Sequence, residues 1–202
     1  MTSGIKSNLP DRDMAHDPHL DQYIEIRNEL MSGTSRNIGK MEDLAYDGSI
    51  MAILFVADAM RAGTFYDQDL KGAEKWYRSA CSSGSARGQT GLGLTHLLNG
   101  EFADAISNLS AACDAEYAPA MNALAGIYFR GDGTPRDFRR ALELWERAVE
   151  LGHFHAQRNL IALSLRGHFG PLRFIRAIPQ AFKFIASEAP RTGESRYAER
   201  YR

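Results

Sequence analysis

The 202-residue chain has few of the features that mark secreted, membrane-spanning or nucleic-acid-binding proteins. Its two cysteines, Cys81 and Cys113, are too few for a disulfide framework. No stretch approaches the roughly 18 uncharged apolar residues that span a bilayer, and the start of the chain lacks the apolar run of a secretion signal. A net charge of −1 provides no basic excess for binding phosphate backbones. We therefore expect a cytoplasmic protein that binds no nucleic acid.

Familiar catalytic signatures are also missing from the sequence. It contains no nucleophile elbow, phosphate-binding loop or dinucleotide-binding glycine pattern. Gly91 and Gly93 lie inside a predicted helix, where close packing accounts for them. We expect neither a cofactor nor enzymatic activity.

What the sequence does contain is an internal repeat. Four units begin at residues 48, 84, 116 and 152, so the successive steps are 36, 32 and 36 residues. Gly63, Gly131 and Gly167 each lie 11 residues after the small residue at the fifth position of their unit. Asp69 and Asp137 also recur in phase, 17 residues after theirs. So many coincidences at one period indicate a repeat architecture.

Each unit has the pattern of two helices joined by a turn. In the third unit the first helix is apolar at helical spacing, as at Ala120, Leu124 and Tyr128, and it ends near a glycine that favours a left-handed cap. A turn rich in glycine and proline follows at 131–136, and the second helix is predicted over 141–151. Because one hairpin cannot bury its own apolar face, the units must stack. The expected fold is an all-α, right-handed α-solenoid (α/α superhelix) of about four helix–turn–helix repeats.

The motifs at 152–160 (Gly-His-x-x-Ala-Gln-x-Asn-Leu) and at 131–145 (Gly-Asp-Gly, then Asp137, Ala141 and Leu-Trp145) resemble the Sel-one-like repeat (SLR), a relative of the tetratricopeptide repeat. The resemblance covers roughly residues 37–186. The second unit departs from it, because Gly100-Glu-Phe-Ala-Asp-Ala105 resembles the tighter tetratricopeptide turn. The resemblance implies a non-enzymatic scaffold or adaptor with a regulatory role. In bacteria, the roles that it implies include control of envelope polysaccharide production and signalling.

The chain divides into four predicted segments. We expect residues 1–20 to be a disordered acidic arm, because they are polar and contain proline. Residues 21–47 are predicted to supply N-terminal helices that cap the array. Residues 48–186 form the solenoid, and residues 187–202 form a polar tail.

The resemblance also gives a register for a binding groove, since the first helices of tetratricopeptide arrays line a concave surface. Guanidinium groups around an apolar floor suit a protein or peptide partner with an acidic segment and apolar anchors. The alternative is that some leucines are core residues and the arginines merely solubilise the surface. The predicted groove residues are Leu54, Arg61, Arg87, Leu94, Leu97, Asn122, Phe129, Arg130, His155, Arg158, Leu165 and Arg166.

Two other functions stay open. Residues 171–185 form a basic amphipathic segment that could dock on a membrane surface. The histidines His153, His155 and His168 could serve a metal-dependent enzyme, although structural zinc sites require four ligands and we expect no metal there.

Three further side chains are interpreted as core residues. His96, at the end of a first helix, is expected to be buried and hydrogen-bonded. Cys81 and Cys113 occupy the same helical site in successive units. Since such helices lie about 8–10 Å apart, farther than a disulfide tolerates, we expect two free, unreactive thiols.

Overall fold

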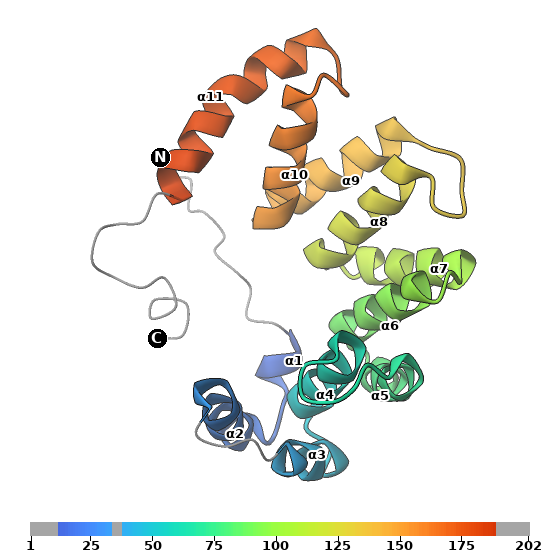
Figure 1. Ribbon diagram of the computed structural model, residues 1–202, viewed down its shortest axis with the longest axis vertical. Coiled ribbons are helices and arrows are strands. Elements are labelled where there is room, and N and C mark those ends of the chain that lie inside the picture. The colour runs from blue at the N-terminus through green and yellow to red at the C-terminus, as the bar shows by residue number, and fades with distance from the viewer. Residues whose placement is uncertain (1–11, 34–37, 189–202) are drawn as a thin grey trace. The chain divides into compact units, whose positions relative to one another are not determined.

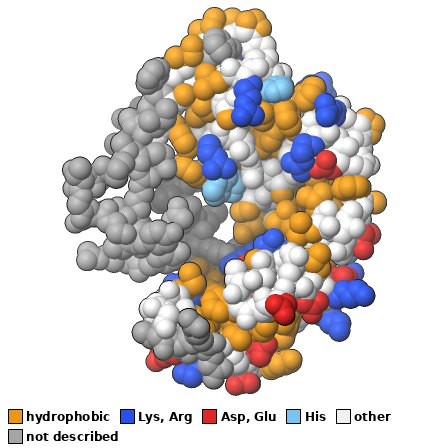
Figure 2. Space-filling view, in the orientation of Figure 1, with side chains coloured by type: hydrophobic (Ala, Val, Ile, Leu, Met, Phe, Trp, Pro, Cys, Tyr) orange, Lys and Arg blue, Asp and Glu red, His pale blue; other side chains and the backbone are white. Residues whose placement is uncertain are grey.

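The computed structural model describes residues 12–33 and 38–188, and these residues are all-α (Figure 1). The chain forms two compact units, Met1–His153 and Phe154–Arg202. On the face seen in Figure 2, hydrophobic side chains are visible among the charged ones. The helices of the described residues are α1 (Arg12–Ala15), α2 (Leu20–Ser32), α3 (Gly39–Tyr46), α4 (Ile50–Ala62), α5 (Leu70–Ser82), α6 (Ala86–Leu98), α7 (Phe102–Asp114), α8 (Ala118–Arg130), α9 (Phe138–Glu150), α10 (Phe154–Leu165) and α11 (Pro171–Glu188).

The first unit contains three complete helix–turn–helix repeats, formed by α4 with α5, α6 with α7, and α8 with α9. The first helices pack on one another, α4 against α6 and α6 against α8. The predicted all-α solenoid of helix–turn–helix repeats is confirmed.

Local sequence signals fix where these helices begin and end. Ser49, Ser85 and Asp137 are N-caps whose side-chain oxygens accept a hydrogen bond from the amide three residues ahead. Gly63 and Gly131 close α4 and α8 in the left-handed conformation, which glycine adopts without steric cost. The caps therefore repeat with the same period as the hydrophobic pattern.

The shorter second repeat results from its turn. Seven residues, 63–69 and 131–137, separate the helices of the first and third repeats, whereas only residues 99–101 separate α6 from α7. This difference accounts for the 32-residue step. The tighter turn predicted at 100–105 is thus present.

Small residues allow the helices of the first unit to approach closely. Ala73 and Ala80 of α5 are fully buried, as are Ala105 and Ala112 of α7. A Cβ atom added at Gly91 of α6 would lie 2.1 Å from the ring of the buried Tyr77. The predicted packing role of this glycine is confirmed.

The N-terminal region differs from the prediction. Helices α2 and α3 occupy the segment expected to be helical, and α3 packs against α4. However, the expectation of a disordered arm over residues 1–20 is wrong for residues 12–20, in which Asp13 and Asp17 are buried. Their carboxylates are not solvated but accept hydrogen bonds at the start of two repeats. Residues 1–11 lie outside the described residues.

The second unit consists of α10 packed against α11. Phe154 stacks on Phe184, with ring centroids 4.8 Å apart. Helix α11 contains Pro179 and extends to Glu188, while the tail predicted at 187–202 lies mostly outside the described residues. Among the described residues, no helix is long and apolar enough to cross a bilayer.

Candidate functional site

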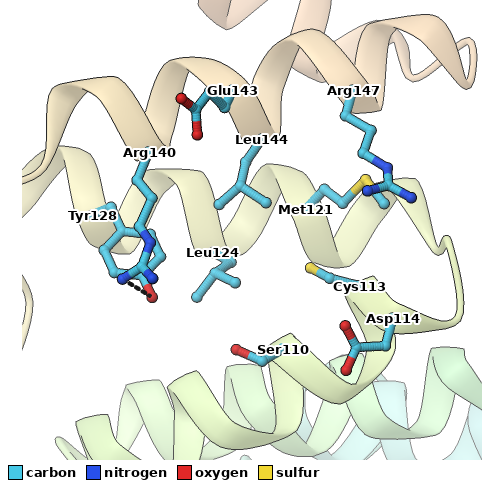
Figure 3. A pocket seen from close by; sticks show the side chains of 10 residues that line it. All are labelled: Ser110, Cys113, Asp114, Met121, Leu124, Tyr128, Arg140, Glu143, Leu144 and Arg147. Atoms are coloured by element: carbon cyan, nitrogen blue, oxygen red, sulfur yellow. Dashed lines mark hydrogen bonds between the residues drawn. The ribbon is translucent and has the colours of Figure 1, made fainter.

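An open cleft of about 370 Å³ lies in the first unit between α7, α8 and α9 (Figure 3). Its floor is apolar, because Met121 and Leu124 of α8 and Leu144 of α9 point into it. Its two walls come from the second helices of neighbouring repeats. The remaining lining residues are Ser110, Cys113 and Asp114 of α7, Tyr128 of α8, and Arg140, Glu143 and Arg147 of α9.

Two arginines border this cleft in different settings. Arg140 Nη1 donates to Tyr128 Oη at 3.4 Å, and the guanidinium lies 5.0 Å from the centroid of the same ring. Arg147 Nη2 forms an ion pair with Glu116 at 3.0 Å, in which both side chains are more than half exposed. An exposed pair of this kind contributes little to stability, so the guanidinium can exchange partners.

The cleft thiol is not a reactive nucleophile. Desolvation by burial, with a smaller contribution from the neighbouring Asp114 carboxylate, raises the pKa of Cys113 to about 11. Burial likewise raises the pKa of Cys81. Both cysteines are free, as predicted. The cleft therefore offers apolar contact and charge pairing rather than covalent chemistry.

The residues that line this cleft are not among the predicted groove residues. The seven-residue spacing of Arg140 and Arg147 places both on one face of α9, and that signal is visible in the sequence. The opposite wall depends on how far α7 lies from α9, which no local pattern determines.

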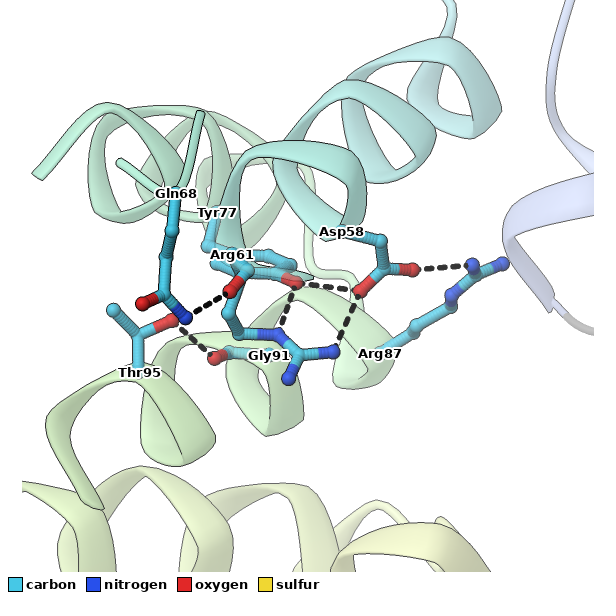
Figure 4. A network of polar contacts seen from close by, with 7 residues as sticks. All are labelled: Asp58, Arg61, Gln68, Tyr77, Arg87, Gly91 and Thr95. Carbon is cyan, nitrogen blue, oxygen red and sulfur yellow. Dashed lines mark hydrogen bonds and ion pairs between the residues drawn. The ribbon is translucent and has the colours of Figure 1, made fainter. Parts of the chain in front are cut away.

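A polar network joins the first two repeats (Figure 4). Asp58 of α4 accepts from Tyr77 Oη of α5 at 2.5 Å and from Arg87 Nη2 of α6 at 2.9 Å. Arg61 Nε donates to Tyr77 Oη at 3.0 Å, and its Nη2 lies 3.4 Å from Asp58 Oδ1. One carboxylate thus ties together three helices.

The charge states of this network follow from its surroundings. Desolvation by burial raises the pKa of Tyr77, and the adjacent Asp58 raises it further, so the phenol stays neutral. Desolvation lowers the pKa of Arg87, but its attraction to Asp58 outweighs this effect and the pKa is raised. Arg61 and Arg87, predicted as groove arginines, are therefore engaged in bracing the repeats.

Leu54 does not line a groove. It is completely buried, and the prediction that it contacts a partner is wrong. The physical reason is that α4 packs against α1, α2, α3, α5 and α6, so it is apolar on nearly all sides and has no free stripe for a ligand. Leu94 and Leu97 of α6 are half-buried, and Leu97 packs against the core of the second and third repeats.

The groove residues of α8 lie close to Trp145 of α9. Asn122 Oδ1 accepts a hydrogen bond from Trp145 Nε1 at 3.0 Å, and the Phe129 ring lies 5.6 Å from the Trp145 ring. Arg130 is exposed and pairs with Asp132 at 2.6 Å. Asn122 and Phe129 thus pack within their own repeat, while Arg130 reaches solvent.

The last four predicted groove residues belong to the second unit. His155, Arg158 and Leu165 of α10 and Arg166, directly after its end, are all exposed. Their spacing places His155, Arg158 and Leu165 on one face of the helix.

One cluster has the side chains of a metal site. His96, Glu101 and Asp104 place one imidazole and two carboxylates within 4.8 Å of one another, because the α6–α7 turn is short. His96 is buried and its Nδ1 contacts Glu101 Oε2, as predicted for a hydrogen-bonded core histidine. That hydrogen bond lowers the pKa of Glu101. The contact gives the imidazole Nδ1 a partner within the protein.

The geometry defines a helical repeat protein of the tetratricopeptide-like α-solenoid class. Residues 50–85 and 118–153 match the family model of the Sel1 repeat, and these stretches coincide with the first and third repeats. The chain is a Sel1-like repeat protein. Repeats of this family generally mediate protein–protein interaction.

Solved structures support the same fold. A Sel1 repeat protein from Oxalobacter formigenes superimposes with a TM-score of 0.59 at 21% identity, covering 72% of this chain and 63% of the other. A protective antigen of uropathogenic Escherichia coli strains with an SLR fold gives a TM-score of 0.58 at 21% identity, covering 79% of this chain and 37% of the other. The chain thus spans less than two thirds of either structure. The comparison with curated proteins gave no match.

Proposed function

We propose that the chain is a non-enzymatic, regulatory scaffold that binds a segment of a partner protein in the cleft between α7, α8 and α9. The observation that carries this proposal is the cleft itself, an open cavity of about 370 Å³ with an apolar floor and two arginines at its border. Its openness suits a protein side chain or short segment better than an enclosed small molecule. The general role of Sel1 repeats in protein interaction supports it.

The cleft favours an acidic segment with an apolar anchor. Arg140 and Arg147 are seven residues apart on α9, which corresponds to about 10.5 Å along a helix. Carboxylates of the partner at that spacing can pair with both guanidinium groups, replacing Glu116 at Arg147. Met121 has an unbranched, adaptable side chain that can adjust to the anchor. Apolar burial supplies most of the affinity, and the charges orient the segment.

A pull-down with charge-reversed bait proteins tests this proposal. The cleft variant Arg140→Glu with Arg147→Glu should retain at least ten-fold less of a partner that the wild type captures, a difference of about 1.4 kcal/mol. The matched control, Lys75→Glu with Arg78→Glu, makes the same charge change at two exposed positions of α5 outside the cleft and should behave as the wild type. Capture by the wild type should weaken with added salt. If all three baits retain a partner equally, the cleft is not its binding site.

The predicted binding groove on the first helices of the repeats stays a prediction. A fourth bait protein tests whether a partner binds there. Arg130 and Arg158 are both exposed, so Arg130→Glu with Arg158→Glu should leave the fold intact. Loss of the partner with this bait, but not with the cleft variant, would assign binding to the first helices.

A peripheral membrane role is a second candidate, supported by one observation. Leu172, Ile175 and Ile178 of α11 are 75%, 61% and 39% exposed. Sedimentation with anionic liposomes tests this candidate, and replacing these three residues with serine should abolish any sedimentation.

A further inference from the structure

The start of the described chain docks on the N-termini of two first helices. Asp17 Oδ2 accepts hydrogen bonds from Ser49 Oγ and from the Met51 backbone amide, both at 2.8 Å. Asp13 Oδ2 accepts from Ser85 Oγ at 2.6 Å. Ser49 and Ser85 are the N-caps of α4 and α6, so each aspartate occupies the start of one repeat. The contacts join residues 32 and 72 positions apart in the chain.

The segment that makes these contacts resembles a bound peptide ligand. Asp13 and Asp17 are more than nine-tenths buried, and Met14 between them packs against the core cluster of the first repeat. Burying a carboxylate is costly unless it is hydrogen-bonded, and the positive end of a helix dipole stabilises it further. The segment thus combines two acidic groups with one apolar anchor.

The spacing of the two aspartates matches the spacing of the repeats. Neighbouring packed helices lie about 8–10 Å apart. Asp13 lies in α1 and Asp17 lies two residues after its end, where the Asp17 amide donates to the Met14 carbonyl in a turn. Asp13 and Asp17 therefore reach α6 and α4 together.

The site is specific to the first two repeats. Ser49 and Ser85 follow Gly48 and Gly84, one repeat apart in the sequence. The equivalent residue of the third repeat is Tyr117, whose side chain does not cap α8. A hydroxyl in this position can cap the helix and donate to a carboxylate at the same time, whereas the Tyr117 side chain does not cap α8.

The docked segment depends on this contact for its shape. Helix α1 has four residues, and isolated helices shorter than about 12 residues are not stable in water. The segment therefore depends on its contacts with the repeats for its helical turn. A tether of this kind acts as a ligand at a local concentration of about 1 mM or more.

We propose that residues 12–18 are an intramolecular ligand of the first two repeats, and that a partner with the same chemistry competes with them. Such a partner carries two carboxylates four residues apart on a short turn, with an apolar residue directly after the first. This site is separate from the cleft of α7, α8 and α9. The contact thus controls access to the start of the repeat array.

A labelled peptide of residues 10–20 tests the proposal in trans. In the full-length variant Asp13→Lys with Asp17→Lys, the reversed charges should release the tethered segment and leave the site open. Fluorescence anisotropy should then show the peptide binding this variant at least ten-fold more tightly than the wild type. The matched control, Asp21→Lys with Glu25→Lys, makes the same charge change at exposed positions of α2 and should bind as weakly as the wild type.

Equal binding to all three proteins, or no binding to a variant with wild-type helix content by circular dichroism, would overturn the proposal. The segment would then be a fixed structural cap. If the double variant loses helix content, Asp17→Ala takes its place, and the same comparison applies. Because these variants leave α7, α8 and α9 unchanged, the result does not depend on the cleft.

Discussion

Glycines in α6 determine how closely it approaches the neighbouring helices. A methyl group at Gly91 would overlap the buried Tyr77 ring. Gly126 of α8 has a different environment, in which the nearest atom to an added Cβ is the end of the flexible Arg130 side chain at 3.0 Å. Two helical glycines therefore have opposite expected responses to alanine.

Gly91→Ala should destabilise the protein by about 1–3 kcal/mol, because the added methyl group overpacks the α5–α6 contact. Gly126→Ala should be neutral or stabilise by up to about 1 kcal/mol, since alanine has the higher helix propensity. Urea unfolding followed by circular dichroism measures both. A destabilisation by Gly126→Ala as large as that by Gly91→Ala would contradict this packing.

Thiol chemistry provides a second prediction at this scale. At pH 8, a cysteine with a pKa of about 11 has about 100-fold less thiolate than one at the ordinary 9.0. Native Cys113 should therefore react with iodoacetamide far more slowly than in urea, as followed by mass spectrometry of its peptide. The rate should rise with pH up to about 11. A native rate equal to the unfolded rate would show that burial does not protect this thiol.

Single residues were only partly predictable from the sequence. His96 and the two cysteines follow from their position in the repeat, because equivalent positions share an environment. Leu54 does not, because its burial depends on α1 and α2, which are not part of the repeat. The repeat register predicts that Arg61 and Arg87 are exposed, but Asp58 of α4 forms ion pairs with both.

At the scale of the helices, the sequence predicted positions well. The first helices begin at residues 50, 86, 118 and 154, each two residues after the predicted start of a unit. Glycine caps and the hydrophobic period determine these positions locally, so they can be derived without the fold. The docking of residues 12–20 could not be derived, since it pairs aspartates with serines far away in the chain.

Tyr77→Phe tests the network between α4, α5 and α6. The variant removes the donor to Asp58 and the acceptor for Arg61, so it should destabilise by about 1–3 kcal/mol. Tyr46→Phe, at a residue 78% exposed, should stay within about 0.5 kcal/mol. Urea unfolding provides the comparison, and equal effects would contradict the network.

The pH dependence of that difference has a defined sign. Burial raises the pKa of Tyr77 above its ordinary value of 10.0. The contribution of the neutral phenol is therefore fully present below about pH 10 and is lost as pH rises through the raised value.

At the scale of the whole molecule, stacked repeats with nearest-neighbour contacts provide a scaffold rather than a single enclosed site. In the first unit, the described residues offer two different surfaces for a partner. One is the cleft formed by the second helices with α8, and the other is the pair of helix N-termini that holds the chain's own acidic segment. The proposed ligand of each surface combines carboxylates with an apolar side chain.

Site-specific photo-cross-linking in cells is the most direct test that the cleft binds a protein. A benzophenone amino acid in place of Ser110 would lie in the cleft wall, whereas the same substitution at the exposed Ser79 of α5 lies outside it. Cross-linking from position 110 should produce a discrete protein adduct that is absent from position 79 and from the Arg140→Glu, Arg147→Glu background. No adduct at position 110, or the same adduct at both positions, would contradict a partner in the cleft.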